Sequence, residues 1–426
     1  MKQIKRISNS NRKNVLHKGY QHGLHNIKQT LKDNDVTMVK TDKSKAIVLI
    51  KTEDLNKKFE HFIKENNIGQ INKDPTEKYQ KMIQQTIKRK TLIFERQQYK
   101  FLTNIKPAPP KLNIYIKTHK QKKPIRPVIN NTEAPTYKVA KYINKKLQQL
   151  LNLPNAYSIK NSLEISEELK NIRIKENNRM LTIDIKELYV NLPVNGVLKT
   201  TRHWLHKNNN SETTITQMLN VIETILQQNY FQYKDGFFQP KKGIAMGSPI
   251  SGTVAEMYIQ YVEAIHIKQW WETGEICYYK RYVDDILIIY NNHKIKNSTI
   301  KQRINTIDKN LEFKMTPENS NTINFLDLTL HRNSNNIELS MYRKPTSTDT
   351  TIHYKSNHPH EHKMAAFGFF INRMTTLPIT KESKTEEWKT IITTAAKNGH
   401  PNHIIHNLKK KLTSKRMQKE THEQKK

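Results

Sequence analysis

Short apolar runs alternate along this chain with long polar stretches that are rich in lysine and asparagine. Such runs predict buried strands when turn residues bound them. Strands are expected in Ala46–Ile50, Leu112–Ile116, Ile125–Ile129, Met180–Ile185, Asn324–His331 and Ile337–Arg343. Two more are expected on either side of Asp284-Asp285, within Tyr278–Tyr290, and Asp235-Gly236 predicts a hairpin in Phe231–Phe238.

Segments in which apolar residues recur between long charged side chains predict amphipathic helices. These segments are Lys51–Leu102, Tyr137–Leu153, Val197–Asn208, Thr214–Gln228, Ser251–Ile267 and most of the chain from Arg343 to Leu408. Met38–Lys43 is polar and is expected to be turn-like. Residues 1–35 predict a loose arm or a helix, and residues 409–426 predict a polar basic tail.

The charge balance points to a polyanionic partner. The 426 residues include 73 Lys and Arg against 38 Asp and Glu, a formal net charge of +35. Nucleic acid is the default partner of so basic a chain, and an acidic membrane surface is the second candidate. No apolar run is long enough to span a bilayer, which weakens the membrane hypothesis. The single cysteine, Cys277, excludes a disulfide scaffold and zinc fingers.

Three acidic residues stand at the ends of predicted buried strands. Asp184 ends one strand, and Asp284 and Asp285 lie between two others. Adjacent acids at a hairpin turn are ordinarily turn chemistry. However, buried strands present carboxylates only at a cost, and bound metal ions would offset that cost. Carboxylates from separate strands that meet in one sheet would suit two Mg²⁺ ions, roughly 3.5–4 Å apart, in a phosphoryl transfer.

Other segments indicate a function only when they are taken together. Tyr189 follows Asp184 closely and could lie under a nucleotide sugar, or could be an ordinary core tyrosine. Gly243–Pro249 could let the backbone approach a base pair, or could be a simple turn. Lys120 belongs to a basic loop that could equally be solvated. Arg126 lies between two prolines, where its geometry would be fixed, and its planar fork suits phosphate oxygens.

The order of these pieces resembles the fingers and palm of a reverse transcriptase: a basic Arg-Pro hairpin, an acid followed by an aromatic residue, a Gly-Ser-Pro loop and Tyr-Val-Asp-Asp. Further segments resemble the Penelope-like retroelement branch, which is related to telomerase reverse transcriptases. They are Lys40–Lys43, Asp74–Thr76, Lys117–Lys120, Ile125–Pro127, Met246–Pro249, Phe325–Asp327, Tyr342–Thr346, Ser356–Pro359 and Asn398–His400. The resemblance covers about residues 36–405.

The resemblance implies an α+β fold of the right-hand polymerase type, with fingers, a palm built on an antiparallel sheet and a helical thumb. The implied domains are a basic N-terminal arm, an N-terminal extension with the fingers, the palm, the thumb and a basic C-terminal tail. Their implied bounds are 1–35, 36–179, 180–335, 336–408 and 409–426. The implied activity is RNA-directed DNA synthesis for a retroelement, in which a primer 3′-hydroxyl attacks a dNTP on an RNA template.

The resemblance also implies a catalytic site. Asp184 and Asp284 would hold two Mg²⁺ ions, for which Mn²⁺ could substitute, and Asp285 would be the supporting acid. Tyr189 would exclude ribonucleotides.

Nucleotide and primer contacts are implied as well. Arg126, and less strongly Lys120, would bind the incoming triphosphate. The nucleotide and template side would be lined by Gly247, Ser248 and Pro249. The primer grip would contain Phe325, Leu326 and Asp327.

Some positions depart from the family pattern. Met246 stands where many reverse transcriptases have Gln, although Met is usual in this branch. Gly252 stands where Pro is common, and Ser44-Lys45 replaces a usual small pair. Many Penelope-like elements continue into a GIY-YIG endonuclease, but no Gly-Ile-Tyr pattern follows the predicted thumb. Either the element lacks the nuclease or the reading frame is truncated.

Other hypotheses stay open. A catalytically silent nucleic-acid-binding remnant of a mobile element would need the basic surface but not the three acids. An RNA-templated RNA polymerase would need room for a ribose where Tyr189 stands. The histidines of residues 353–362 could bind a metal, but no acid or cysteine completes a set, so hydrogen bonding or phosphate contact is favoured. The basic tail could be a nuclear-localisation signal, which would fit action in the nucleus, or a nucleic-acid-binding arm.

Overall fold

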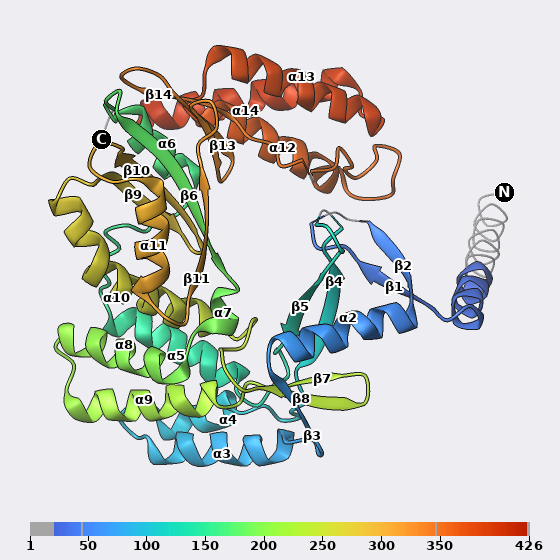
Figure 1. The fold of residues 1–426 in the computed structure, drawn as a ribbon. Coiled ribbons are helices and arrows are strands. Elements are labelled where there is room, and N and C mark those ends of the chain that lie inside the picture. The colour runs from blue at the N-terminus through green and yellow to red at the C-terminus, as the bar shows by residue number, and fades with distance from the viewer. Residues whose placement is uncertain (1–20, 44–45, 119, 346, 424–426) are drawn as a thin grey trace. The chain divides into compact units, whose positions relative to one another are not determined.

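A computed structural model describes residues 21–43, 46–118, 120–345 and 347–423 (Figure 1). The chain forms two compact units, and each is built from segments that are far apart in the sequence. The first unit contains Met1–Pro75, Ala108–Glu133 and Tyr230–Lys241. The second unit contains Thr76–Pro107, Ala134–Asn229 and Lys242–Lys426. The predicted domain bounds at 179/180 and 335/336 stay predictions.

A five-stranded sheet forms the first unit, with the strand order β3-β8-β7-β4-β5. Its strands are β3 (Ile68–Ile71), β4 (Lys111–Ile116), β5 (Ile125–Asn130), β7 (Phe231–Tyr233) and β8 (Gly236–Pro240). The predicted hairpins β4–β5 and β7–β8 are confirmed. Helix α2 (Thr52–Glu65) packs Phe59 against Ile68 and Phe231 of the sheet.

The long helix predicted over Lys51–Leu102 is wrong in its middle. The chain forms α2, then strand β3, then α3 (Thr76–Arg89) and α4 (Tyr99–Leu102). Strand β3 exists because Ile68 to Ile71 pair antiparallel with Pro240 to Phe237 of β8. That partner is remote in sequence, so local periodicity could not reveal the strand.

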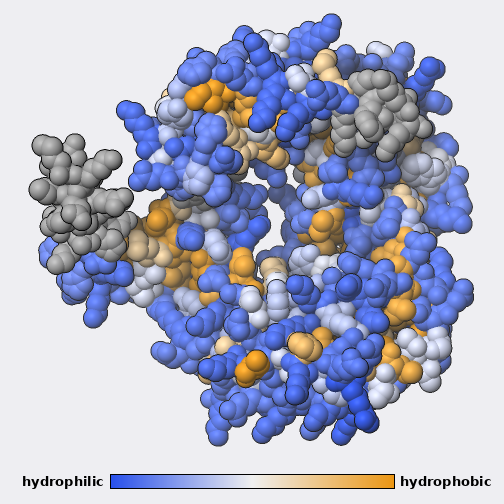
Figure 2. All heavy atoms as spheres, turned by 180° about the vertical axis from the view of Figure 1, so that it is seen from behind, coloured by the Kyte–Doolittle hydropathy of each residue, from blue (hydrophilic) through white to orange (hydrophobic). Residues whose placement is uncertain are grey.

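A two-stranded sheet, β1 (Val36–Lys40) and β2 (Ile47–Lys51), also belongs to the first unit. The turn-like expectation for Met38–Lys43 is therefore wrong over its first half. The burial expected of β2 is also wrong, because Ile47 and Leu49 are 62% and 63% exposed. One face of the sheet packs Val39 into a small core, while Met38, Ile47 and Leu49 on the other face are exposed. Figure 2 shows a hydrophobic patch over this sheet on a face that is otherwise mostly hydrophilic.

A four-stranded antiparallel sheet, here called the central sheet, lies in the second unit with the order β11-β6-β10-β9. Its strands are β6 (Asn178–Lys186), β9 (Ile276–Tyr282), β10 (Asp285–Asn291) and β11 (Glu312–Pro317). Alternate residues of β10 enter two different cores: Ile286 and Ile288 enter one, and Leu287 and Ile289 the other. Both faces are covered, which explains the unbroken apolar run.

Helices cover one face of the central sheet (Figure 1). They include α5 (Tyr137–Leu150), α8 (Val194–Lys207), α9 (Glu212–Leu226) and α10 (Ser251–Glu272), and α11 (Asn297–Ile307) contacts β11. The predicted helices are confirmed in type, with ends that differ by a few residues. The other face packs against α6 (Ser162–Lys170) and a three-stranded sheet.

The three-stranded sheet corrects another prediction. Asn324–His331, expected as one strand, is the hairpin β12 (Thr322–Phe325) and β13 (Leu328–Arg332), followed by β14 (Ile337–Met341). Leu326 has a positive φ of 54°, which turns the chain between the two strands.

Three C-terminal helices complete the second unit: α12 (His360–Thr376), α13 (Lys381–Lys397) and α14 (Asn402–Glu423). The predicted tail from residue 409 is therefore helical as far as Glu423. Leu408 and Leu412 pack against the core of these helices, and this apolar contact carries the helix past the expected end. Among the described helices, none has the length and hydropathy needed to cross a bilayer.

Candidate active site

The central sheet brings the three predicted acids to one end. Asp184 lies near the end of β6, Asp284 in the β9–β10 turn, and Asp285 is the first residue of β10. Strands β6 and β10 are neighbours, and their register places Asp184 directly opposite Asp285. The Ile185 N–H donates a hydrogen bond to the Asp284 carbonyl at 2.9 Å, which fixes the turn against β6. Asp184 is exposed and the other two are half-buried, so solvent and ligands can reach this end of the sheet.

The turn that carries Asp284 is strained. Tyr282 pairs with Asp285, so only Val283 and Asp284 connect the two strands. Val283 has a φ of 55°, in the left-handed region that β-branched residues avoid. Such a conformation costs on the order of 1–3 kcal/mol and persists where surrounding contacts enforce it.

The donor set fits divalent metal ions whose coordination the substrate completes. No group of three or more His, Cys, Asp and Glu residues is placed to hold a metal ion by itself within the described parts of the chain. Mg²⁺ is commonly held by one or two carboxylates together with substrate phosphates and waters. Carboxylates from β6 and from the facing turn supply that partial set of oxygen ligands.

Tyr189 lies beside the acids, on the short helix α7 (Leu188–Asn191) that follows β6. Burial raises the pKa of the Tyr189 phenol, and the charges of Asp284 and Glu256 raise it further. The phenol is therefore neutral at physiological pH. Its ring also packs against the main hydrophobic core, so Tyr189 is both a core residue and a neighbour of the acids.

The predicted glycine loop docks on α7. The Ile244 N–H donates to the Tyr189 carbonyl at 2.8 Å. Gly243 has a φ of +85°, and a Cβ there would lie 2.4 Å from the Val190 carbonyl oxygen, so only glycine permits this approach.

Further along the same loop lie the three residues predicted to line the nucleotide side. Gly247 is exposed, with a φ of 96°, and Ser248 and Pro249 are half-buried. The Ser248 hydroxyl is buried and has no hydrogen-bond partner among the residues that the structure describes.

Arg126 and Lys120 lie in the first unit, on β5 and in the β4–β5 turn. The Arg126 side chain is 48% exposed, and its Nε lies 3.1 Å from Asp42 Oδ1. The Asp42 side chain is only 4% exposed, and its Oδ2 is buried without a hydrogen-bond partner among the described residues. Asp42 and Arg126 are far apart in the chain, so their pairing was not predicted from the sequence.

The predicted primer-grip residues form the β12–β13 turn and its flank. Phe325 is buried, and Leu326 is the positive-φ turn residue. The Asp327 carboxylate accepts a hydrogen bond from Ser162 at 3.1 Å and pairs with Arg373 at 3.2 Å. These contacts tie the hairpin to α6 and α12, and a contact with a primer stays a prediction.

Two histidines of the predicted cluster, His353 and His358, make local hydrogen bonds. His353 Nδ1 accepts from the Lys355 N–H at 3.2 Å, and His358 lies 3.2 Å from the Ser356 hydroxyl. A buried histidine outside the cluster, His400, belongs to the Asn398–His400 segment of the family resemblance. Its Nε2 lies 2.9 Å from the Ile352 carbonyl oxygen, which joins α13 and α14 to the loop before α12.

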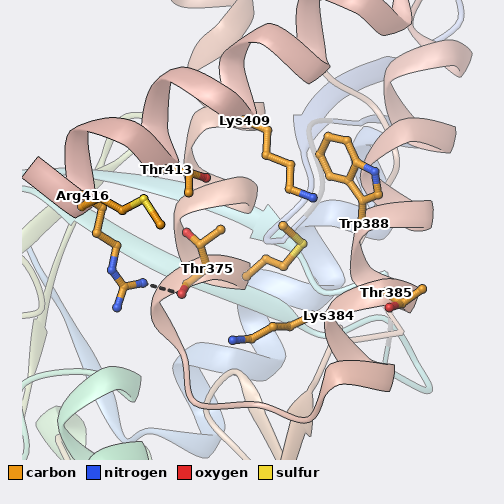
Figure 3. A pocket seen from close by; sticks show the side chains of 9 residues that line it. Thr375, Lys384, Thr385, Trp388, Lys409, Thr413 and Arg416 are labelled. Atoms are coloured by element: carbon orange, nitrogen blue, oxygen red, sulfur yellow. Dashed lines mark hydrogen bonds between the residues drawn. The ribbon is translucent and has the colours of Figure 1, made fainter.

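A groove of about 430 Å³ opens among the three C-terminal helices (Figure 3). Its lining residues are Met374, Thr375, Lys384, Thr385, Trp388, Lys409, Thr413, Arg416 and Met417. Figure 3 shows the Lys409 ammonium directed toward the Trp388 ring, 4.1 Å from its centroid. Arg416 donates a hydrogen bond to the Thr375 carbonyl. Cations beside an aromatic ring suit phosphates and bases. This groove was not predicted from the sequence.

Two family models match the chain. Residues 117–371 match the model described as reverse transcriptase (RNA-dependent DNA polymerase). Residues 350–410 match the model described as animal helix-turn-helix domain. The first match covers more than half of the chain, so the chain belongs to the reverse transcriptase family, whose members are nucleotidyltransferases that generally use divalent metal ions.

Solved telomerase structures share the fold. Telomerase from Candida albicans in complex with a TWJ fragment of telomeric RNA is 12% identical, with a TM-score of 0.55 over 87% of this chain and 65% of that chain. Apo telomerase from Candida tropicalis is 14% identical, with a TM-score of 0.52 over 85% of this chain and 65% of that chain. The chain thus spans slightly less than two thirds of these telomerases. The predicted α+β polymerase fold is confirmed. No curated protein sequence matches the chain.

Proposed function

We propose that this protein is an RNA-directed DNA polymerase that extends a primer 3′-hydroxyl with dNTPs on an RNA template. The observation that carries the proposal is the register of the central sheet, which places Asp184 opposite Asp285 with Asp284 in the adjoining turn. That arrangement occurs in a chain of the reverse transcriptase family.

Asp184 and Asp284 would hold two Mg²⁺ ions, which Mn²⁺ could replace, with Asp285 as the supporting acid. When bound, such ions stabilise the attacking and leaving oxygens of an in-line displacement. The protein positions the reacting groups and places negative charge where the ions are needed. Asp284 and Asp285 are half-buried, whereas Asp184 is exposed.

Nucleotide selection would fall to the residues that the sequence motifs single out. The neutral ring of Tyr189, held by packing and by the docked glycine loop, would exclude a 2′-hydroxyl. Gly247, Ser248 and Pro249 would line the nucleotide and template side. Arg126, with Lys120, would bind the triphosphate, because its guanidinium is half-exposed and oriented by Asp42.

The template–primer duplex would be bound through charge spread over the chain, consistent with the net charge of +35. In this proposal the first unit contributes the fingers, the central sheet is the palm, the β12–β13 hairpin is the primer grip, and the C-terminal helices are the thumb. The motifs of the Penelope-like branch favour a retroelement enzyme that acts in the nucleus.

Primer extension on a defined RNA template tests the proposal. Asp184→Asn and Asp284→Asn should each reduce extension by about 10³-fold or more, because an amide is a poor ligand for these ions. Both variants should retain the affinity of the wild-type protein for an RNA–DNA duplex in a gel-shift assay.

Two outcomes would contradict the proposal. Normal primer extension by both variants would show that Asp184 and Asp284 do not form the catalytic site. Duplex binding without any metal-dependent incorporation by the wild-type protein would instead support a catalytically silent binding protein.

A further inference from the structure

A buried ionic cluster lies directly beneath the strained turn of the candidate active site. Arg281 stands on β9, two residues before Val283, and its side chain is only 1% exposed. Its counter-ions are Glu256 and Glu263, about two turns apart on one face of α10. Arg281 follows Glu263 by 18 residues and Glu256 by 25 and lies on a different element, so local sequence patterns did not predict that the three side chains meet.

Every part of the Arg281 guanidinium is hydrogen-bonded. Nε and Nη2 donate to Glu263 at 2.7 and 3.1 Å. Nη2 and Nη1 donate to Glu256 at 2.8 and 2.9 Å, and Nη2 also donates to the Ser158 hydroxyl at 3.0 Å. Finally, Nη1 donates to the Val283 carbonyl oxygen at 3.1 Å. The last bond leaves the ionic cluster and reaches the turn itself.

The cluster is itself anchored from several sides. The Tyr279 hydroxyl donates to Glu263 at 3.1 Å, and Ser158 donates to Glu256 at 2.5 Å. The Arg281 backbone N–H donates to the Tyr157 carbonyl at 2.8 Å, which joins β9 to the preceding segment. The guanidinium therefore has a fixed position and orientation.

Stability alone does not account for such a cluster. Replacing a buried ion pair by apolar residues of similar volume is often neutral or stabilising, because burial of charge is costly. The bond to Val283 gives the cluster a second role. The Val283 carbonyl belongs to the peptide that joins Val283 to Asp284, and Val283 holds the unfavourable φ of 55°. A bond to this carbonyl restrains the peptide plane from which the Asp284 carboxylate projects.

We infer that Arg281 is a positioning residue: its guanidinium, held by Glu256 and Glu263, fixes the Val283–Asp284 peptide and thereby aims the Asp284 carboxylate at the metal ions. The inference rests on the proposed polymerase function for its catalytic consequence. Arg281 is buried, so it acts through the turn and touches neither substrate nor metal.

The test compares three variants. Arg281→Lys keeps the charge but loses the planar fork, so it cannot hold both glutamates and Val283 at once. The triple variant Arg281→Met, Glu256→Gln, Glu263→Gln removes the bond to Val283 without leaving a buried unpaired charge, which preserves folding. Arg303→Lys is the control, because Arg303 lies on α11 and pairs with Glu275 at 2.8 Å, next to the end of β9 that is opposite to Arg281 and the acids.

Primer extension and Mn²⁺ binding, followed by electron paramagnetic resonance, are the two readouts, and thermal unfolding checks the fold. Arg281→Lys and the triple variant should lower kcat about 10- to 100-fold, leave the KM for dNTP within about 2-fold, and weaken Mn²⁺ binding about 5-fold. Arg303→Lys should change neither kcat nor Mn²⁺ affinity.

The inference is overturned if the folded triple variant keeps wild-type kcat and Mn²⁺ affinity. A wild-type protein that extends no primer would count against the polymerase function instead. In that case the Mn²⁺ measurement still decides the role of Arg281, since equal affinities in the wild type and the variants would overturn it.

Discussion

Arg126 of the first unit and Arg281 of the second unit are held in opposite ways. Arg126 is half-exposed and pairs with one carboxylate, that of Asp42. Arg281 is fully buried and divides its donors among two carboxylates, a hydroxyl and a backbone carbonyl. An arginine whose donors are all used inside the protein sets geometry, whereas one with donors at the surface can bind an anion.

The carboxylates show the same contrast. Asp42 is buried with one oxygen that has no partner among the described residues, so its interaction with Arg126 fixes the arginine without saturating the acid. In the cluster, Glu256 and Glu263 each receive two bonds from Arg281 and further bonds from neighbouring hydroxyls. The first arrangement suits a ligand site, and the second suits a rigid support.

The largest expected effect is on stability, and it separates the two arginines. Arg281→Met leaves the buried Glu263 and the half-buried Glu256 without their cation, which costs about 3–5 kcal/mol. Arg126→Met leaves only the Asp42 carboxylate without its cation, and water can reach the half-exposed place of the guanidinium, so the loss should be smaller, about 1–3 kcal/mol. Urea denaturation of the two variants measures both values. Equal losses in the free energy of unfolding would show that the difference in burial between Arg281 and Arg126 does not affect stability.

The second effect is on substrate binding, and here the change at Arg126 should matter more than the change at Arg281. Arg126→Met should raise the KM for dNTP about 10- to 100-fold, because it deletes charge-assisted hydrogen bonds to phosphate. Arg303→Met is the matched control, since Arg303 is similarly exposed and pairs with Glu275 at 2.8 Å. Steady-state primer extension measures the KM, and an unchanged value in Arg126→Met would remove this residue from the nucleotide site.

The third effect concerns pH. Burial alone would raise the pKa of Glu256, but hydrogen bonds and charge from Arg281, with hydrogen bonds from Ser158 and Gln260, lower it to about 2. A lowered pKa in the folded state stabilises the protein at pH values above 4.5, the ordinary pKa of this carboxyl group. This stabilisation is lost as the pH falls toward 2.

Glu256→Gln removes this titration. The wild type should therefore be more stable than the variant at pH 7, and the difference should shrink steadily between about pH 4.5 and pH 3. Urea denaturation at several pH values measures it. A difference that is constant with pH would mean that Glu256 is not held charged by Arg281.

The smallest effect is expected at the groove among the C-terminal helices. Lys384 and Lys409 are partly exposed cations, as Arg126 is. Replacing both with Gln should reduce the slope of log affinity for an RNA–DNA duplex against log salt by about 1–2, while kcat is unchanged. Lys57→Gln with Lys268→Gln, two exposed lysines on α2 and α10, is the control pair. An equal change in both pairs would show that the groove contributes only through net charge.

Local features of the sequence were enough to predict most elements near the candidate site. The apolar runs on either side of Asp284-Asp285 predicted β9 and β10, because short runs between turn residues are typical of buried strands. The glycine loop and the helix after it were also predicted, since glycine and proline interrupt regular structure locally. Three acids among apolar strands indicated a metal site, because carboxylates are costly to bury without cations.

The tertiary structure alone decided how these elements meet. The pairing of β6 with β10 sets Asp184 against Asp285, and the pairing of β3 with β8 turns part of an expected helix into a strand. The packing of α10 on the central sheet places Glu256 and Glu263 around Arg281. Each of these depends on a partner remote in the chain. The sequence by itself thus determined which residues could do chemistry, and long-range pairing and packing determined which of them act together.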